Sequence, residues 1–201
     1  NEEESLVATI ESVQEVVPEI DFLIINDGSK DNTVKICREH QYPFVDLSTN
    51  LGLAGGFQTG MKYAYRHGYD CAIQFDADGQ HLPQYIPAMM KAIESADIAI
   101  GSRFINSKKP KSMRMLGSNL IEGAIKLTTG KTLTDPTSGM RAFNKRMIEQ
   151  MARGLNMGPE PDTVSYLIKR ANAKVVEVPV TMAERFAGES YLNPWSSSMY
   201  M

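Results

Sequence analysis

Two short, largely apolar runs, each followed at once by acidic residues, constrain the fold of this chain more than any other feature. The first covers residues 23–25 and leads to Asp27, and the second covers residues 72–75 and leads to Asp76 and Asp78. Apolar runs of this length predict buried strands of a parallel sheet. A buried strand that ends in carboxylates delivers them to the edge of the sheet where open α/β folds bind ligands. We therefore expect an α/β fold with a polar site at that edge.

Strand and helix patterns alternate through the first half of the chain. Ser5 is expected to cap the first helix, and Asp31 or Asn32 the second. A helix is expected to end near residue 67, after a glycine-rich loop over residues 50–60. Further helices are predicted from residue 6, from residue 33 to 40 and over 84–95, with strands over 44–46 and 97–100. This alternation with short connections predicts a parallel sheet covered by helices on both faces.

The second half of the chain has a different pattern. It opens with a basic segment at residues 107–115 and continues with a helix over 113–129. Residues 135–143 are predicted to be a loop that feeds a strand, and the segment EPDT at 160–163 precedes a further helix. A last strand covers 174–180, and its Pro179 marks it as an edge strand or a strand end.

Length, charge and cysteine content limit the class of protein. A chain of 201 residues fits one α/β domain, and its net charge of −3 argues against a general nucleic-acid binder. Cys37 and Cys71 stand beside apolar residues, which favours buried, reduced thiols of a cytosolic protein over a disulfide framework. No apolar run approaches the ~18 residues of a membrane span, and no signal peptide is visible.

The pair Asp76 and Asp78 predicts a divalent-cation site. Carboxylates are the hard oxygen ligands that magnesium or manganese prefers, and such ions usually bind together with a substrate diphosphate. The alternative is a structural turn in which Asp78 helps to cap the next helix. The glycines of residues 50–60 are not followed by the Lys-Ser/Thr pair of a phosphate-binding loop, so no ATP site is predicted there.

Taken together, the acidic turns, the DxD-type pair and the late basic residues resemble family 2 glycosyltransferases, which are inverting nucleotide-sugar enzymes with the GT-A fold. The pattern is most similar to the dolichyl- or polyprenyl-phosphate sugar transferase branch, whose acidic motif DADxQH matches Asp76, Asp78, Gln80 and His81. The resemblance extends over nearly the whole chain, from NEEES at residues 1–5 to ERFAGES at residues 184–190. It implies a single domain over residues 1–201 with a mostly parallel, Rossmann-like sheet. Residues 1–101 would bind the nucleotide sugar, and residues 102–201 would form the acceptor half and tail.

The family places a proline and an aromatic residue before the Asn-Glu-Glu run that matches residues 1–3, and neither is present here. This departure predicts that the first strand of the fold is missing. The resemblance also implies the parts of a donor site. The nucleotide would be bound by Asn1, Glu3, Asp27, Gly28, Asp76, Ala77 and Arg185, and the magnesium or manganese ion by Asp76, Asp78 and Gln80.

The acceptor site is implied by three further matches. Asp135, Ser138 and Gly139 match the family's Asp-x-x-Ser-Gly loop beside the sugar. Basic residues that hold an acceptor phosphate in the polyprenyl branch are matched by Arg103 and Arg114. The late Arg-x-x-Gly-x-Ser segment, which closes over a phosphate, is matched by Arg185 and Ser190, although Tyr191 replaces the lysine that commonly follows.

The chemistry of the acceptor decides which side chains the reaction needs. A sugar hydroxyl must lose its proton to a carboxylate, and the candidate catalytic carboxylates are Glu160, Asp162 and Asp135. A lipid phosphate is already an anion and needs cations instead. The acidic EPDT segment and the lysine missing at Tyr191 favour a cell-envelope polysaccharide or lipid-linked glycan as the acceptor. Polyprenyl phosphate is the alternative acceptor.

Two other classes of function remain as alternatives: a nucleotidyltransferase, and a non-catalytic module that binds nucleotide sugars. Trp195, Met199 and Tyr200 are expected either to begin a segment in peripheral contact with a membrane or to form a frayed terminus. We expect the protein in the cytoplasm. If these residues contact a membrane, we expect it at the inner face of the cell membrane. The donor's base and sugar and the oligomeric state are not predicted.

Overall fold

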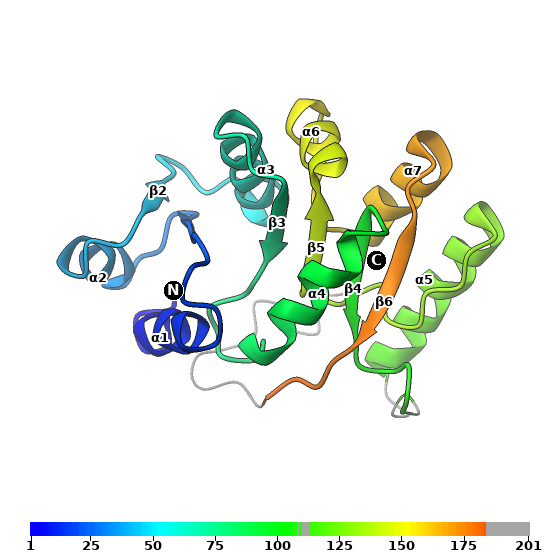
Figure 1. Ribbon diagram of the computed structural model, residues 1–201, viewed down its shortest axis with the longest axis horizontal. Coiled ribbons are helices and arrows are strands. Elements are labelled where there is room, and N and C mark those ends of the chain that lie inside the picture. The colour runs from blue at the N-terminus through cyan, green and yellow to red at the C-terminus, as the bar shows by residue number, and fades with distance from the viewer. Residues whose placement is uncertain (108, 110–112, 184–201) are drawn as a thin grey trace.

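The computed structural model describes residues 1–107, 109 and 113–183, apart from the side chains of residues 113, 114 and 116. Its strands form a parallel pair and a separate four-stranded sheet, with helices packed around both (Figure 1). The α/β class with helices on both faces, expected from the alternating patterns, is confirmed. Among the described residues, no helix combines the length and the apolar character needed to cross a bilayer.

The parallel pair lies in the N-terminal part of the molecule. Residues Ile24–Asn26 form β1 and Phe44–Asp46 form β2, with Ile25 opposite Val45. Asn26 Nδ2 donates to Asp46 Oδ1 at 2.7 Å across the ends of the two strands. The pair is packed against three helices, α1 (Leu6–Val16), α2 (Thr33–Glu39) and α3 (Gly52–Arg66).

The four-stranded sheet has the order β3-β5-β4-β6 and is mixed. Its strands are β3 (Cys71–Gln74), β4 (Ile98–Ser102), β5 (Arg141–Asn144) and β6 (Val175–Pro179). β4 and β6 are parallel, whereas β5 runs antiparallel to both β3 and β4. The sheet therefore departs from the mostly parallel arrangement at β5. Because β5 runs in the opposite direction, the loop that precedes it lies at the edge where β3 and β4 end.

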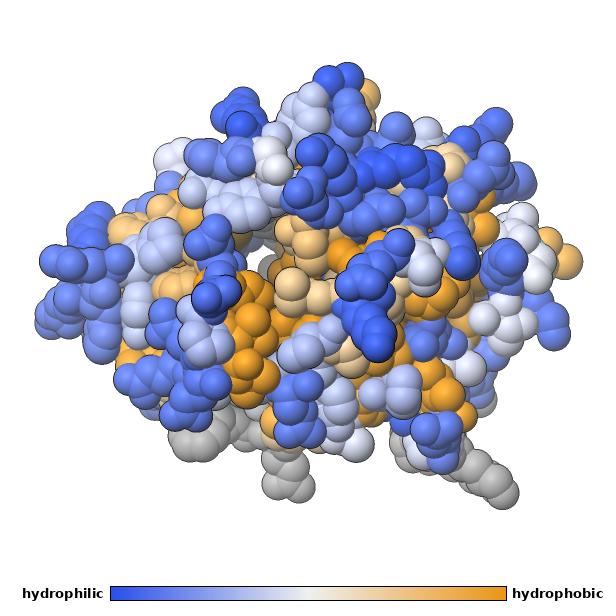
Figure 2. Space-filling model, viewed as in Figure 1, coloured by the Kyte–Doolittle hydropathy of each residue, from blue (hydrophilic) through white to orange (hydrophobic). Residues whose placement is uncertain are grey.

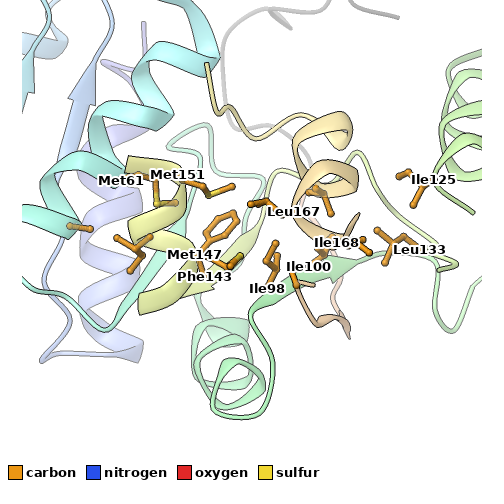
Figure 3. Close-up of a cluster of buried hydrophobic side chains, with 14 residues drawn as sticks. Met61, Ile98, Ile100, Ile125, Leu133, Phe143, Met147, Met151, Leu167 and Ile168 are labelled. Carbon is orange, nitrogen blue, oxygen red and sulfur yellow. The ribbon is translucent and has the colours of Figure 1, made fainter. Parts of the chain in front are cut away.

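Alternate residues of the central strands face two separate apolar clusters, as the pleat of a strand requires. Ile98, Ile100 and Phe143 belong to the cluster beneath α3, α6 (Lys145–Arg153) and α7 (Pro161–Ala171), shown in Figure 3. Ala99 and Ala142 belong to the cluster on the opposite face, beneath α4 (Ile86–Ile93). The remaining elements are a 3₁₀ turn η1 (Pro83–Tyr85) and helix α5 (Met113–Thr129), which packs against α7.

Several local expectations are corrected by the structure. The glycine-rich loop predicted over 50–60 is wrong from Gly52 onward, because α3 begins there. Glycine has a low helix propensity, but Gly56 and Gly60 lie on the side of α3 that packs on β1, where an added Cβ would make an ordinary contact with Ile25 at 3.8 Å. Ser5 makes no side-chain capping bond, and its hydroxyl instead lies 3.0 Å from the carboxylate of Glu2. Helix α6 was not anticipated at all.

Candidate active site

Asp27 follows β1 and is fixed against the start of α3. Its Oδ1 accepts the backbone N–H of Leu51 at 2.6 Å, and its carbonyl accepts a bond from Asn50 Nδ2 at 2.7 Å. Gly28 adopts φ +77°, and a Cβ at this position would lie 3.5 Å from Asn50. The positive φ, which side-chain-bearing residues adopt only with strain, is therefore what favours glycine here, since 3.5 Å is an ordinary contact distance.

The predicted nucleoside contacts at the N-terminus lie on the turn that follows Gly28. Glu3 Oε2 accepts from the backbone N–H of Asn32 at 2.9 Å and from its Nδ2 at 2.8 Å. Asn1 Oδ1 accepts from the N–H of Lys30 at 2.8 Å. Residues 1–5, Lys30 and Asp31 line an open cavity of about 360 Å³ beside this turn. The structure thus brings the Asn-Glu-Glu match at residues 1–3 next to the turn that follows Gly28.

The turn after β3 is ordered by its own backbone. Asp76 N–H donates to His81 Nδ1 at 2.9 Å, and Gln80 N–H donates to Asp78 Oδ1 at 3.0 Å across Gly79, which has φ +78°. The carbonyl of Ala77 accepts a bond from the Thr9 hydroxyl at 3.3 Å, which attaches the turn to α1.

His81 is buried, with its Nε2 3.7 Å from Asp76 Oδ2. Burial lowers the pKa of this imidazole and outweighs the opposing influence of Asp76 and Asp78. In the neutral ring Nδ1 accepts, so the proton lies on Nε2 and faces the Asp76 carboxylate. The side chain of Asp76 is 46% exposed, whereas Asp78 is buried. His81 therefore holds the backbone of Asp76 and lies beside a carboxylate that solvent can reach.

The donors in this turn fit a divalent cation that binds together with a phosphate group. Within the described ranges, no group of three or more His, Cys, Asp or Glu side chains could hold a metal ion. Two carboxylates are nevertheless sufficient where substrate phosphates complete the coordination, which is how magnesium is commonly bound. Asp76 and Asp78 therefore fit a cation shared with a substrate better than a permanent structural ion.

Arg103 is held in a fixed direction by a buried carboxylate. Its Nε and Nη2 donate to the two oxygens of Asp135 at 2.6 Å and 2.8 Å, and its backbone N–H donates to Oδ2 at 3.2 Å. The Asp135 side chain is 0% exposed, while that of Arg103 is 27% exposed. Glu177 of β6 accepts from the backbone N–H of Asp135 at 2.9 Å. Both Asp135 oxygens are thus occupied by the guanidinium, whose outer side reaches solvent.

The loop before β5 packs directly on the acidic turn. A Cβ added to Gly139 would lie 2.8 Å from Asp76 Oδ2 and 3.2 Å from the His81 ring. Ser138 is 1% exposed, and its Oγ has no hydrogen-bond partner among the described residues. A buried hydroxyl without a partner is unfavourable, so Ser138 is suited to bind a ligand group at this edge.

Arg141 ties this loop to the segment before α7, a role that sequence reasoning missed. The side chain is fully buried and donates to the carbonyls of Ser138 at 2.9 Å, Pro136 at 2.7 Å and Pro159. Burial lowers the pKa of Arg141 to about 10, although three carboxylates, those of Glu160, Asp135 and Asp76, favour its charged form. An arginine that begins an otherwise apolar strand was the only signal in the sequence. Glu177 was missed in the same way.

Glu160 and Asp162 flank the first residue of α7. Glu160 occupies the N-cap position without a side-chain capping bond, and Asp162 lies in the first helical turn. A Cβ at Gly158 would lie 2.8 Å from Ala54, so this segment packs against the first turn of α3, close to Asp27. Both carboxylates therefore belong to the same edge of the molecule as the acidic turns.

Three predicted site features fall outside this description. The side chain of Arg114 and residues Arg185 and Ser190 lie outside the described residues. The structure gathers the others at the carboxyl edge of the strands, from Asp27 through the Asp76 turn to the Arg103–Asp135 pair. Such an edge provides carboxylates for a cation, an oriented guanidinium for an anion, and a buried hydroxyl for a polar ligand.

Comparison with known proteins gives a consistent result. The family model described as glycosyl transferase family 2 matches residues 1–152. An undecaprenyl-phosphate mannosyltransferase from Micrococcus luteus is 32% identical over 96% of this chain and 84% of the relative. A UDP-N-acetylglucosamine–dolichyl-phosphate N-acetylglucosaminyltransferase from Methanococcus voltae is 32% identical over 79% of this chain and 72% of the relative.

The fold is also similar to that of a solved enzyme. The crystal structure of glucosyl-3-phosphoglycerate synthase from Mycobacterium tuberculosis in complex with Mn²⁺ and uridine-diphosphate-glucose matches with a TM-score of 0.68. The match covers 94% of this chain and 69% of that chain at 16% sequence identity. At this level of identity the similarity concerns the fold alone, which is the GT-A arrangement expected from the sequence.

Proposed function

The chain belongs to glycosyl transferase family 2 and is a glycosyltransferase, and from this premise we propose that it transfers a sugar from a nucleotide-diphosphate donor to a polyprenyl phosphate. The sequence alone favoured a glycan hydroxyl as acceptor. The names of the two relatives support the alternative instead, since both refer to lipid phosphates. We place the reaction at the inner face of the cell membrane.

The observation that carries this proposal is the Arg103–Asp135 pair beside the Asp76 turn. A phosphate oxygen is already an anion at neutral pH, so it attacks without a general base but must be held by cations. Arg103 is aligned by two short bonds to a fully buried carboxylate. The guanidinium keeps further N–H groups outside that pair, and the side chain is 27% exposed, which suits it to bind an incoming phosphate.

Each remaining residue takes a role in positioning the donor. Asp27 and Glu3 accept hydrogen bonds from the nucleoside, and Ser138 Oγ gains the sugar or phosphate contact that its buried position requires. Asp76, Asp78 and Gln80 would hold a magnesium or manganese ion, and the chemistry that such an ion would supply is positive charge beside the leaving diphosphate. His81 holds the backbone of Asp76 in place through its Nδ1. Glu160 and Asp162 would bind donor hydroxyls from the segment that packs against the first turn of α3.

The transfer itself is a single displacement. An acceptor phosphate oxygen forms the bond to the anomeric carbon while the bond from that carbon to the donor diphosphate breaks. Nucleoside diphosphate leaves with the electron pair, and the sugar configuration inverts, as the family resemblance implies. Arg103 holds the attacking phosphate oxygen in line with the bond that breaks. Such alignment of the reacting groups supplies much of the rate enhancement in reactions of this kind.

The acceptor assignment is tested with Arg103→Lys, which keeps the charge but loses the planar fork. We expect the KM for a short-chain polyprenyl phosphate to rise about tenfold, because charge-assisted hydrogen bonds are each worth about 1.5–3 kcal/mol. The KM for the nucleotide sugar should stay within about twofold. The matched control is Arg38→Lys on the exposed surface of α2, which should change neither constant.

Three other results would overturn the proposal. An unchanged acceptor KM in Arg103→Lys would show that Arg103 does not bind the acceptor phosphate. Transfer to glycan hydroxyls but not to polyprenyl phosphate, abolished by Glu160→Gln or Asp162→Asn, would restore the base mechanism. Release of pyrophosphate in place of nucleoside diphosphate would identify a nucleotidyltransferase.

A further inference from the structure

Strand β6 contains one charged residue, Glu177, in the otherwise apolar run VVEVP. Its neighbours Val176 and Val178 pack into the apolar cluster beneath α4, on the face seen in Figure 2, where hydrophobic residues reach the surface around α4 and β6. Because side chains alternate along a strand, Glu177 points to the opposite face, as does Ile100, its partner in β4. A half-buried carboxylate in such a strand is unfavourable unless it is hydrogen-bonded.

The bonds that Glu177 accepts among the described residues come from Thr134 and Asp135. The Thr134 N–H lies 2.9 Å from each carboxylate oxygen, and the Thr134 hydroxyl donates to Oε1 at 3.1 Å. The Asp135 N–H donates to Oε1 at 2.9 Å. A carboxylate accepts at both oxygens and donates nothing, so it matches this set of donors. Glu177 thereby fixes the backbone at the point where the Asp135 side chain begins.

A second branch of the same network reaches the other side of Arg103. The Thr134 hydroxyl proton is used on Glu177, so Ser102 Oγ, 2.6 Å away, donates to Thr134 Oγ1. Ser102 Oγ in turn accepts from the Phe104 N–H at 3.3 Å. The direction of this chain of hydrogen bonds is therefore set by the carboxylate at its end.

Both branches end at groups that contact the Arg103 guanidinium. Asp135 accepts from its Nε at 2.6 Å and from its Nη2 at 2.8 Å. The ring centroid of Phe104 lies 5.1 Å from its central carbon. The two groups that surround the guanidinium are thus attached to one carboxylate on β6.

We propose that Glu177 is a positioning residue that sets the direction of the Arg103 guanidinium. It acts through Asp135 on one side and through the Thr134–Ser102 hydroxyl pair on the other. A planar guanidinium that is already held in one orientation loses less freedom when it binds an anion. The consequence for an acceptor phosphate rests on the proposed function, whereas the orientation of Arg103 does not.

Chemical modification of arginine tests the orientation without the enzymatic reaction. Phenylglyoxal reacts with accessible guanidinium groups, and mass spectrometry of the treated full chain gives the rate at Arg103 relative to the exposed Arg38. In wild type, the pairing with Asp135 should make Arg103 the slower of the two. Glu177→Gln, which replaces one acceptor oxygen by a donor, should raise the relative rate about three- to tenfold, as expected for one lost hydrogen bond.

A second variant removes only the hydroxyl branch of the network. Thr134→Val keeps the backbone N–H that binds Glu177 and loses the hydroxyl that binds Ser102. It should raise the relative rate at Arg103 about twofold, the low end of the effect of one hydrogen bond. Thermal unfolding of each variant verifies that it is folded.

Asp97→Asn is the matched control, because Asp97 is a carboxylate with similar bonds at the other end of β4. Its Oδ2 accepts from the Lys174 N–H at 2.7 Å, and its Oδ1 accepts from Asn144 Nδ2 at 2.9 Å. This variant should lower the thermal midpoint yet leave the relative rate at Arg103 unchanged. Equal rises in Asp97→Asn and Glu177→Gln would indicate general loosening of the sheet and would overturn the positioning role.

Kinetics with polyprenyl phosphate test the consequence for the acceptor. Glu177→Gln should raise the acceptor KM about three- to tenfold and leave the donor KM within about twofold. In the Arg103→Lys background, the same substitution should change the acceptor KM less than about twofold, because the effects of residues in one network are not additive. The same factor in both backgrounds would show that Glu177 acts independently of Arg103 and would overturn the inference.

The modification experiment separates this inference from the proposed function. An unchanged relative rate at Arg103 in both Glu177→Gln and Thr134→Val would overturn the inference, whatever the acceptor. A raised rate combined with no transfer to polyprenyl phosphate would support the positioning role and refute the proposed function alone.

Discussion

At the scale of single residues, the site depends on backbone positions where a side chain cannot be accommodated. Gly139 packs so closely on the Asp76 turn that an added Cβ would lie 2.8 Å from the carboxylate and 3.2 Å from His81. The loop and the turn therefore behave as one surface. The identity of Gly139 was predicted from the sequence, but its contact with Asp76 was not, because the two residues are far apart along the chain.

Gly139→Ala should displace Asp76 and weaken manganese-dependent binding of nucleoside diphosphate at least about tenfold, or ~1.4 kcal/mol. Isothermal titration with and without manganese measures the effect. Gly123→Ala is the control, since its Cβ would meet no described atom within 4 Å. That substitution should leave binding unchanged and raise the free energy of unfolding by about 0.5–1 kcal/mol. Equal affinities for Gly139→Ala and wild type would remove Asp76 from the site.

At the scale of elements, the sequence predicted those whose apolar spacing is strong. Helix α5 and strand β2 have the predicted boundaries, and β6 is the expected edge strand. Periodicity does not encode direction, so the antiparallel β5 could not be recognised. Helix α6 was missed although Met147, Ile148 and Met151 are all buried at helical spacing. The glycine-rich start of α3 was mistaken for a loop because tertiary packing against Ile25 outweighed propensity.

The start of α6 offers a test of how strongly a cap fixes such a helix. Asn144 Oδ1 accepts from Met147 N–H at 3.1 Å, and its Nδ2 donates to Asp97 at 2.9 Å. Asn144→Ala should lower the free energy of unfolding by about 1–2 kcal/mol in urea denaturation. Asn32, at the start of α2, makes no side-chain capping bond and is exposed, so Asn32→Ala should cost less than half as much. Equal losses would mean that the Asn144 cap contributes nothing of its own.

At the scale of the whole molecule, the site draws on β1, β3, β4, the loop before β5 and the segment before α7. Sequence patterns located most of these pieces because each follows a strand or precedes a helix. They did not reveal the supports Arg141 and Glu177, whose partners are backbone carbonyl and N–H groups that no side-chain pattern marks. The preference for a hydroxyl acceptor rested on the carboxylates of EPDT and on the lysine missing at Tyr191. The carboxylates do not by themselves distinguish a base from a donor contact.

The stability of the molecule should depend on pH through His81. Burial lowers the pKa of this histidine below its ordinary 6.5, so the folded state binds its proton less readily than the unfolded state. The stabilisation is complete above about pH 6.5 and is lost as pH falls from there toward the folded pKa. Urea denaturation from pH 7.5 to 5 should show this loss in wild type.

His81→Asn should reduce the pH dependence in that range, because the titrating ring is gone while an amide oxygen can still accept the Asp76 N–H. The exposed His40 serves as the comparison, and His40→Asn should retain the wild-type slope. Parallel curves for wild type and His81→Asn would show that other groups account for the loss.

The insertion of β5 between β3 and β4 limits how this enzyme can be recombined with its relatives. The sequence predicts a boundary near residue 101 between a donor half and an acceptor half. In the sheet, however, β5 of the second half lies between β3 and β4 of the first half. Gly139 of the second half also packs against Asp76 of the first half. A chimera that exchanges acceptor halves therefore has to import a strand into the middle of a foreign sheet. Acceptor preference in this architecture should evolve through loops and helix faces more readily than by exchange of modules.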